Sequence, residues 1–261
     1  MKDINTIKIN FKGGIIPPAD LYNILVAAGK SGLGYVRFGL RQQLLLDIEM
    51  EDLEFFTTEL GMLGIGYELN NEEFPNIISS YPAAEVFILN TWVKAQVYHG
   101  IFELFNYNPR LKINICDANQ SFTPMLTGNI NWVASPDETN FWYLFIRFPK
   151  TNIVYGWKEL FHTKNLAGMS IQVEEVILRN KARFYDNEEA SGDELYEKLN
   201  TGAFSTKPVE VPLALPPYNL PYYEGFNRYN DKYWLGIYRR DELFNIQFLK
   251  EICLLCLTTQ I

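Results

Sequence analysis

Basic side chains within apolar, extended segments are the residues of this sequence that could do chemistry. Arg37 and Arg41 lie in 36–48, a run of mostly apolar neighbours that predicts one long strand. A buried arginine is costly unless a carboxylate or another anion meets it. One interpretation is that Arg37 or Arg41 is solvated at a strand end, or paired with Asp47 or a glutamate. The other is an anion site for carboxylates, phosphate or an oxyanion substrate.

A second pair of cations follows later in the chain. Arg110 and Lys112 are two residues apart, so on a strand their side chains would point to one face. The alternative is that they lie on a solvated edge. Lys8 alternates with Ile7 and Ile9, which predicts a first strand with one polar and one apolar face.

The elements around these cations can be inferred from the sequence pattern. A strand near 7–11 leads into the turn Gly13-Gly14, and Pro17-Pro18 suits a helix entry. Apolar residues at helical spacing then predict a helix, which three glycines end. A helix over 50–63 and a short strand over 65–69 follow the long strand. Residues 5–69 therefore read as β-α-β-α-β.

These segments resemble the siroheme-dependent nitrite and sulfite reductases. Gly13-Gly14-Ile15-Ile16-Pro17-Pro18-Ala19-Asp20-Leu21 with Arg37-Phe38-Gly39-Leu40-Arg41-Gln42 is similar to the Gly-Gly and Arg-Leu-Thr-x-Arg-Gln segments of the family's ferredoxin-like half-domain. The segments 74–80, 108–113 and 129–134 resemble its Arg-Asn-Val, Pro-Arg-Lys-Phe-Lys and Asn-Asp-Ile-x-x-Val-Ala segments in the same order. The resemblance covers about residues 5–180.

The resemblance implies a site of clustered cations. Carried over residue by residue, Lys8, Arg37, Arg41, Arg110 and Lys112 would bind the eight carboxylates of siroheme. Arg41 and Lys112 would also be catalytic, because cations near bound nitrite or sulfite stabilise or protonate oxygen during its reduction.

Three departures from the family pattern bear on this site. Lys8 and Asn10 stand where arginines are usual, and Arg147-Phe148-Pro149-Lys150 stands where glycines would permit close backbone approach. The cysteine pattern of the family's [4Fe–4S] cluster does not occur, so the cysteines present do not support that cluster. In the family, the cluster cysteines belong to the second of two tandem copies.

The rest of the chain supplies further expected elements. A long helix is expected over 86–105, and strands over 112–116, 129–134, 141–148 and 171–178. A short helix or turn is expected over 160–166. Prolines between 208 and 221 indicate an extended linker. Gly236–Leu243 repeats features of Gly14–Leu21 at an offset of 222 residues, and an apolar helix follows. Cys253 and Cys256 lie in this helix and are interpreted as core residues rather than metal ligands, because a second cysteine pair is lacking.

The predicted fold class is therefore α+β. A ferredoxin-like half-domain (1–73) is followed by a mixed-sheet nitrite/sulfite reductase-like domain (74–182), a linker (183–231) and the start of a second half-domain (232–261). On this interpretation the 261 residues are a fragment or remnant of a longer two-copy protein.

Composition narrows the function classes. A net charge of −8 argues against a nucleic-acid surface. No apolar run is long enough for a membrane span, and no signal-peptide core is present. Three cysteines suit a reducing cytoplasm rather than a disulfide scaffold.

Two function hypotheses remain open. The first is a redox module that binds siroheme and an oxyanion, nitrite or sulfite, and takes electrons from a donor protein or fused domain. The second is a non-catalytic relative that acts as a scaffold or docking domain for an attached electron-transfer domain such as a rubredoxin.

Overall fold

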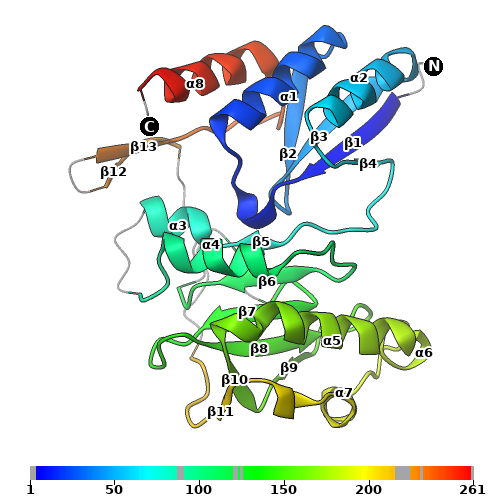
Figure 1. Cartoon of the computed structure of the whole chain (residues 1–261), viewed down its shortest axis with the longest axis vertical. Helices are drawn as coiled ribbons and strands as arrows, with labels where there is room; N and C mark the ends of the chain where they lie inside the picture. The colour runs from blue at the N-terminus through cyan, green and yellow to red at the C-terminus, as the bar shows by residue number, and fades with distance from the viewer. Residues whose placement is uncertain are drawn as a thin grey trace. The chain divides into compact units, whose positions relative to one another are not determined.

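The chain forms two compact units in a computed structural model that describes residues 4–86, 91–119, 123, 126–214, 224–229 and 232–259. Unit 1 comprises Met1–Glu73, Tyr223–Phe226 and Leu235–Ile261, and unit 2 comprises Phe74–Tyr222 and Asn227–Trp234. Figure 1 shows the elements in chain order. Within the described residues, no helix combines the length and the apolar character that crossing a membrane requires.

Unit 1 is an antiparallel sheet covered by helices on one face. Its elements are β1 (Ile4–Asn10), a 3-10 turn (Lys12–Gly14), α1 (Pro18–Lys30), β2 (Tyr35–Gly39), β3 (Gln43–Glu49), α2 (Met50–Met62), β4 (Glu68–Leu69), β14 (Phe244–Asn245) and α8 (Ile246–Thr259). The strand order is β14-β2-β3-β1-β4. The first six helices and strands follow the β-α-β-β-α-β order of ferredoxin-like folds.

The core of unit 1 forms because apolar residues alternate along the central strands. Ile7 and Ile9 of β1 face the same side as Leu44, Leu46 and Ile48 of β3, and all are buried against the helices. Helices α1 and α8 lie side by side on this face (Figure 1). The alternate residues form an opposite, polar face that no described helix of unit 1 covers.

The expected single strand over 36–48 is wrong, because the chain forms a hairpin there. Gln42 donates its backbone N–H to the Gly39 carbonyl at 2.9 Å and adopts a positive φ of 55°. Gly39 then pairs with Gln43, and Arg37 with Leu45. Arg37 therefore lies on β2, whereas Arg41 lies in the turn.

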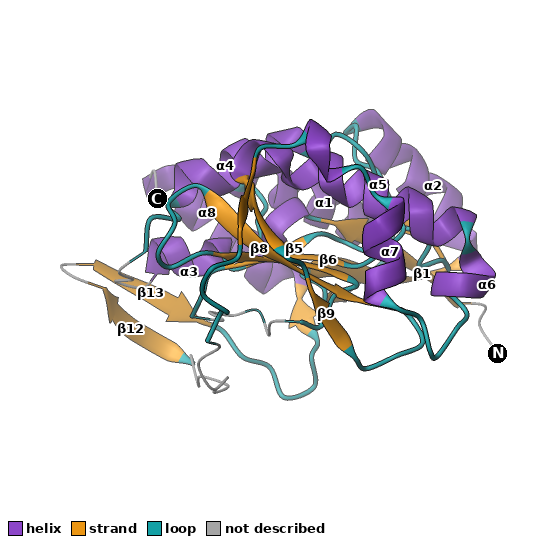
Figure 2. Cartoon of the chain, turned by 90° about the horizontal axis from the view of Figure 1, so that it is seen from below, coloured by secondary structure: helices purple, strands orange, loops and turns teal. Residues whose placement is uncertain are grey.

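Unit 2 is a mixed sheet with helices on one face (Figure 2). Its elements are β5 (Ile78–Ser79), α3 (Tyr81–Val86), α4 (Ala95–Leu104), β6 (Ile113–Cys116), β7 (Ile130–Ala134), β8 (Phe141–Arg147), β9 (Val154–Gly156), β10 (Glu159–His162), a 3-10 turn (Thr163–Asn165), α5 (Leu166–Arg179), α6 (Lys181–Phe184), α7 (Gly192–Lys198), a second 3-10 turn (Thr201–Ala203) and β11 (Thr206–Pro208). The strand order is β11-β10-β8-β7-β6-β5, with β9 on β8, and β5, β6 and β7 are parallel. The remaining strands β12 (Gly225–Tyr229) and β13 (Lys232–Gly236) form a two-stranded ribbon.

Two apolar layers of unequal size follow from the alternation in unit 2. Ile113 and Ile115 of β6, with Trp132 of β7, face the helical side and pack in the main core with α4 and α5. Cys116 and Val133 face the other side, where a smaller apolar cluster lies. Lys112 is one residue before β6, so it belongs to the side opposite α4 and α5.

Several expected elements of this region are wrong. The segment 171–178 is part of helix α5, because its buried residues recur at helical spacing. The helix expected over 86–105 is α4 alone at Ala95–Leu104, and 87–90 lie outside the described residues. Of the segment 160–166, where a short helix or turn is expected, 160–162 belong to β10, whereas 163–165 form the expected turn. In the described part of 183–231, α7 buries Leu195 in the core of unit 2 and β11 pairs with β10.

Candidate anion-binding site

The Gly-Gly and Arg-Gln segments meet at one end of the unit 1 sheet. Asn10, the last residue of β1, pairs with Gln43, the first residue of β3. Gly14 has a φ of 81°, and a Cβ built on it would lie 2.5 Å from Oε1 of Gln42. Only a glycine at this position lets the Gln42 side chain lie against the turn. Arg41 is half-buried in the adjoining hairpin turn.

Lys8 and Arg37 both form ion pairs on the polar face of unit 1. Lys8 is 5% exposed and is paired with Glu68, the residue opposite it on β4. Nη2 of Arg37 lies 2.8 and 2.6 Å from the two carboxylate oxygens of Asp47. The interpretation that Arg37 pairs with Asp47 is therefore confirmed. Carboxylates therefore neutralise both cations within unit 1, and their role in binding a cofactor stays a prediction.

Arg110 and Lys112 lie before β6 rather than on it, and the side chains of Glu174 and Asn129 hold their backbone. The N–H groups of Arg110 and Leu111 both donate to Oε2 of Glu174 on α5, each at 2.7 Å. Lys112 donates its N–H to Oδ1 of Asn129 at 3.0 Å. Leu111 is buried, whereas Arg110 and Lys112 are exposed. The guanidinium of Arg110 also lies 5.8 Å from the centroid of the Phe74 ring.

Glu174 is a positioning residue that sequence reasoning missed. It is 9% exposed, and burial raises the pKa of its carboxyl, while the two N–H donors and Arg110 oppose that rise. The signal in the sequence was a glutamate at a core position of an amphipathic helix. It was lost when 171–178 was read as a strand.

Phe148 stands where the family resemblance predicts glycine, and its side chain lies in the core of unit 2. It is 2% exposed and stacks on Phe184 with ring centroids 5.8 Å apart. The bulky residue therefore fills the core rather than a space for a ligand.

The described residues offer little to a metal. They contain no group of three or more His, Cys, Asp or Glu side chains placed to hold a metal ion. Cys116 and Cys253 are buried thiols, and Cys256 is partly exposed. Cys253 lies in the unit 1 core, as the sequence predicts, whereas Cys256, which was expected there too, does not belong to it.

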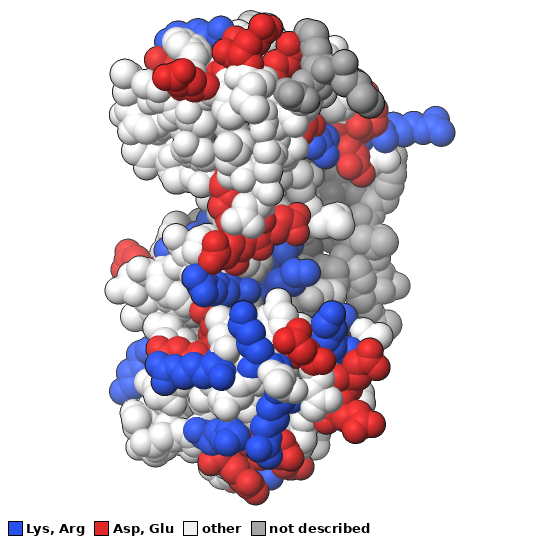
Figure 3. All heavy atoms as spheres, turned by 90° about the vertical axis from the view of Figure 1, so that its right-hand side faces the viewer, with Lys and Arg blue, Asp and Glu red and all other residues white. Residues whose placement is uncertain are grey.

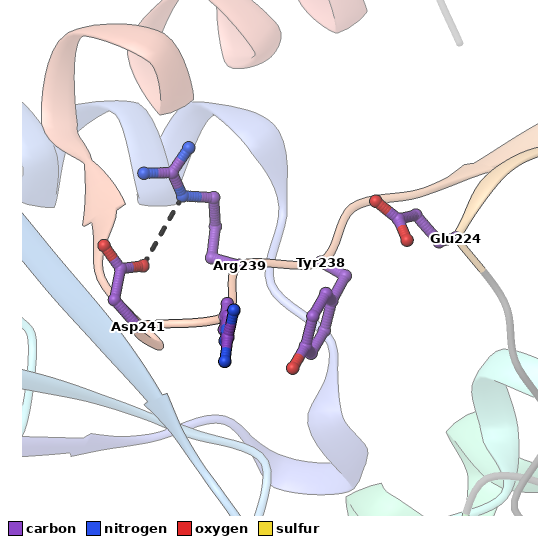
Figure 4. A pocket seen from close by; sticks show the side chains of 5 residues that line it. Glu224, Tyr238, Arg239 and Asp241 are labelled. Atoms are coloured by element: carbon purple, nitrogen blue, oxygen red, sulfur yellow. Dashed lines mark ion pairs between the residues drawn. The ribbon is translucent and has the colours of Figure 1, made fainter.

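A separate cavity of about 770 Å³ lies in unit 1. Its described lining residues are Glu224, Tyr238, Arg239, Arg240 and Asp241. The Arg239 side chain points to Asp241, with Nε and Oδ1 3.6 Å apart (Figure 4). None of the five cations that the sequence predicts as site residues belongs to this lining.

Comparisons with known proteins identify the fold. No family model matches the chain, and no curated protein matches it. The solved structure of the Mycobacterium tuberculosis NirA protein matches with a TM-score of 0.64 and 12% sequence identity, over 98% of this chain and 50% of that one. The chain thus spans about half the length of this structural neighbour. The predicted α+β class with a nitrite/sulfite reductase-like fold is confirmed, while membership of that family stays a prediction.

Proposed function

We propose that this chain is the siroheme-binding half of a redox protein that reduces an oxyanion, nitrite or sulfite. The observation that carries the proposal is the fold that the chain shares with NirA over 98% of its length. Siroheme, when bound, supplies the iron centre at which such a reduction proceeds. Electrons would come from a donor protein or a fused domain, and nothing in this mechanism needs nucleic acid or a membrane.

The cation set of this proposal is smaller than the sequence predicts. Arg41, Arg110 and Lys112 would hold the carboxylates of siroheme. The turn at Gln42 fixes the backbone of Arg41, Glu174 fixes that of Arg110, and Asn129 fixes that of Lys112. Arg41 and Lys112 would also bind the substrate oxyanion. Lys8 and Arg37 are left out, since Glu68 and Asp47 neutralise them.

The second candidate function is a non-catalytic scaffold or docking domain for an attached electron-transfer domain such as a rubredoxin. The ion pairs of Lys8 and Arg37 favour it, because two of the five cations expected at the site are paired with carboxylates of the same chain.

An absorption spectrum of the purified natural protein separates the two candidates. The first predicts siroheme bands that weaken in a variant carrying Arg41→Gln and Lys112→Gln and persist in Arg179→Gln, a surface control paired with Glu175. A colourless protein that also fails to take up added siroheme would reject the first candidate and favour the second.

A further inference from the structure

Lys112, Asn129 and Arg147 form a cross-strand row at one edge of the unit 2 sheet. Ile130 of β7 pairs with Ile113 of β6 and with Ile146 of β8, so these three residues stand one position further toward the edge. All three belong to the face opposite α4 and α5. Strand spacing places the Cα atoms of Lys112 and Arg147 about 10 Å apart.

Asn129 fixes the spacing of the two cations. Its Oδ1 accepts the N–H of Lys112 at 3.0 Å, and its Nδ2 donates to the carbonyl of Arg147 at 3.1 Å. The backbone N–H of Arg147 donates in turn to the Asn129 carbonyl at 2.9 Å. One amide side chain therefore joins the backbones that carry both charges.

The loop after β8 holds the guanidinium of Arg147 without neutralising it. Nε donates to the carbonyl of Thr151 at 3.3 Å, and Nη2 donates to Oδ1 of Asn152 at 3.0 Å. Both acceptors are uncharged, and the group has further N–H donors for a ligand. The same loop carries the exposed Lys150.

We name Lys112, Arg147 and Lys150 the basic edge. These three side chains differ from Lys8 and Arg37 in what surrounds them. Within the part of the chain that the structure describes, no carboxylate lies within ion-pair distance of these three side chains. Figure 3 shows several Lys and Arg side chains over unit 2 in this view, with Asp and Glu side chains among them.

The opposite end of unit 2 has the reverse charge. A cavity of about 380 Å³ lies where β7 ends, and its lining includes Asp137, Glu138 and Glu210. The only cation of that lining among the described residues is Lys207, which is paired with Glu138 at 2.5 Å. An anionic ligand would therefore be repelled there and attracted to the basic edge.

We infer that the basic edge binds a ligand with two or more carboxylates, and that Arg147 is its fixed binding group. Arg147 takes one carboxylate through its remaining N–H groups, while the flexible Lys112 takes a second. This deepens the proposed function, whose cofactor is a polycarboxylate, and adds a residue that occupies the place of a glycine in the family pattern.

The test uses benzenehexacarboxylate as the probe and the full chain without siroheme, with affinity measured by isothermal titration calorimetry. Arg147→Gln is expected to raise the Kd about tenfold, since it removes a charged hydrogen bond. Lys112→Gln should also weaken binding. Because the Lys112 side chain is exposed, this substitution should leave the protein folded. Asn152→Ala should weaken binding although it leaves the net charge unchanged. Arg179→Gln is the matched control and should bind as the parent does.

Three results would overturn the inference. The parent protein does not bind the probe, the parent and Arg147→Gln have equal Kd values, or Arg179→Gln loses as much affinity as Arg147→Gln. An unchanged Kd in Asn152→Ala would overturn the role of the loop. A colourless protein that binds the probe through Arg147 would contradict the siroheme proposal and still support this site.

Discussion

At the scale of single residues, Glu174 has the clearest physical signature. Burial raises the pKa of its carboxyl above the ordinary value. The folded state therefore keeps this proton to a higher pH than the unfolded state does, and the free energy of unfolding falls as the pH rises between the two pKa values.

Glu174→Gln should remove this dependence, since an amide keeps an acceptor for the N–H groups of Arg110 and Leu111 and carries no charge. The free energy of unfolding of the variant, relative to that of the parent, is expected to increase from pH 4 to pH 7, measured by urea unfolding. Glu174→Ala should lose about 2 kcal/mol at both pH values, because two buried N–H groups lose their acceptor. The exposed Glu175→Gln serves as control. A gain that shrinks with rising pH in Glu174→Gln would contradict the account.

The single-residue predictions from sequence succeeded where partners were close in the chain. Asp47 lies ten residues from Arg37, and their pairing was one of the two interpretations of the pattern. Glu68 lies sixty residues from Lys8, and only the register of β4 on β1 brings them together. Asn129 and Arg147 were missed for the same reason, since their relation depends on how β7 and β8 are paired.

At the scale of elements, the hairpin over 36–48 shows why the sequence misled. Apolar residues continue on both sides of the turn, so the run looks unbroken. Gly39 is the only common turn residue there, and Gln42 adopts the left-handed region that asparagine or glycine usually occupies. The same ambiguity affected 171–178, since a short apolar run does not distinguish a strand from a buried helix face.

The turn itself can be tested at Gly14. Gly14→Ala should destabilise unit 1 by about 2 kcal/mol, because alanine pays for the positive φ and also displaces Gln42. Gly64→Ala is the matched control: its φ is 69°, nothing lies within 4 Å, and only the backbone cost of about 1 kcal/mol applies. Urea unfolding measures both. Adding Gln42→Ala to Gly14→Ala should recover the difference, and equal losses in the two glycine variants would disprove the close approach.

Phe148 offers a second test of an element, the end of β8. Phe148→Ala should cost about 3–5 kcal/mol, because it removes a buried ring stacked on Phe184. Thermal unfolding of unit 2 measures this loss. Tyr185→Ala, at a half-buried neighbouring position, should cost less. A nearly neutral Phe148→Ala would mean that the ring lies outside the core.

At the scale of the whole molecule, unit 1 is built from both ends of the chain. The sequence predicts that 232–261 begins a second half-domain, and this boundary stays a prediction. In the structure β14 pairs with β2, and α8 packs on α1. Helix α8 begins 228 residues after α1, so the offset of 222 in the sequence pattern does not align the two helices. That packing could not be foreseen, because it depends on a contact between residues more than 200 positions apart.

This organisation predicts how the molecule responds to loss of residues 235–261. Deletion removes the buried side chains of Ile246, Leu249 and Cys253 from the unit 1 core and uncovers the facing side of α1. At about 1.5–3 kcal/mol for each side chain, the loss approaches the whole stability of a small domain. Hydrogen exchange should therefore show collapsed protection in β1, β3 and α1. Strands β6, β7 and β8 of unit 2 should keep theirs, because their core contains no residue from 235–261.

Leu255→Ser, at a side chain that is 60% exposed, should leave both units protected. Retained protection of α1 after the deletion would show that the unit 1 core is complete without α8.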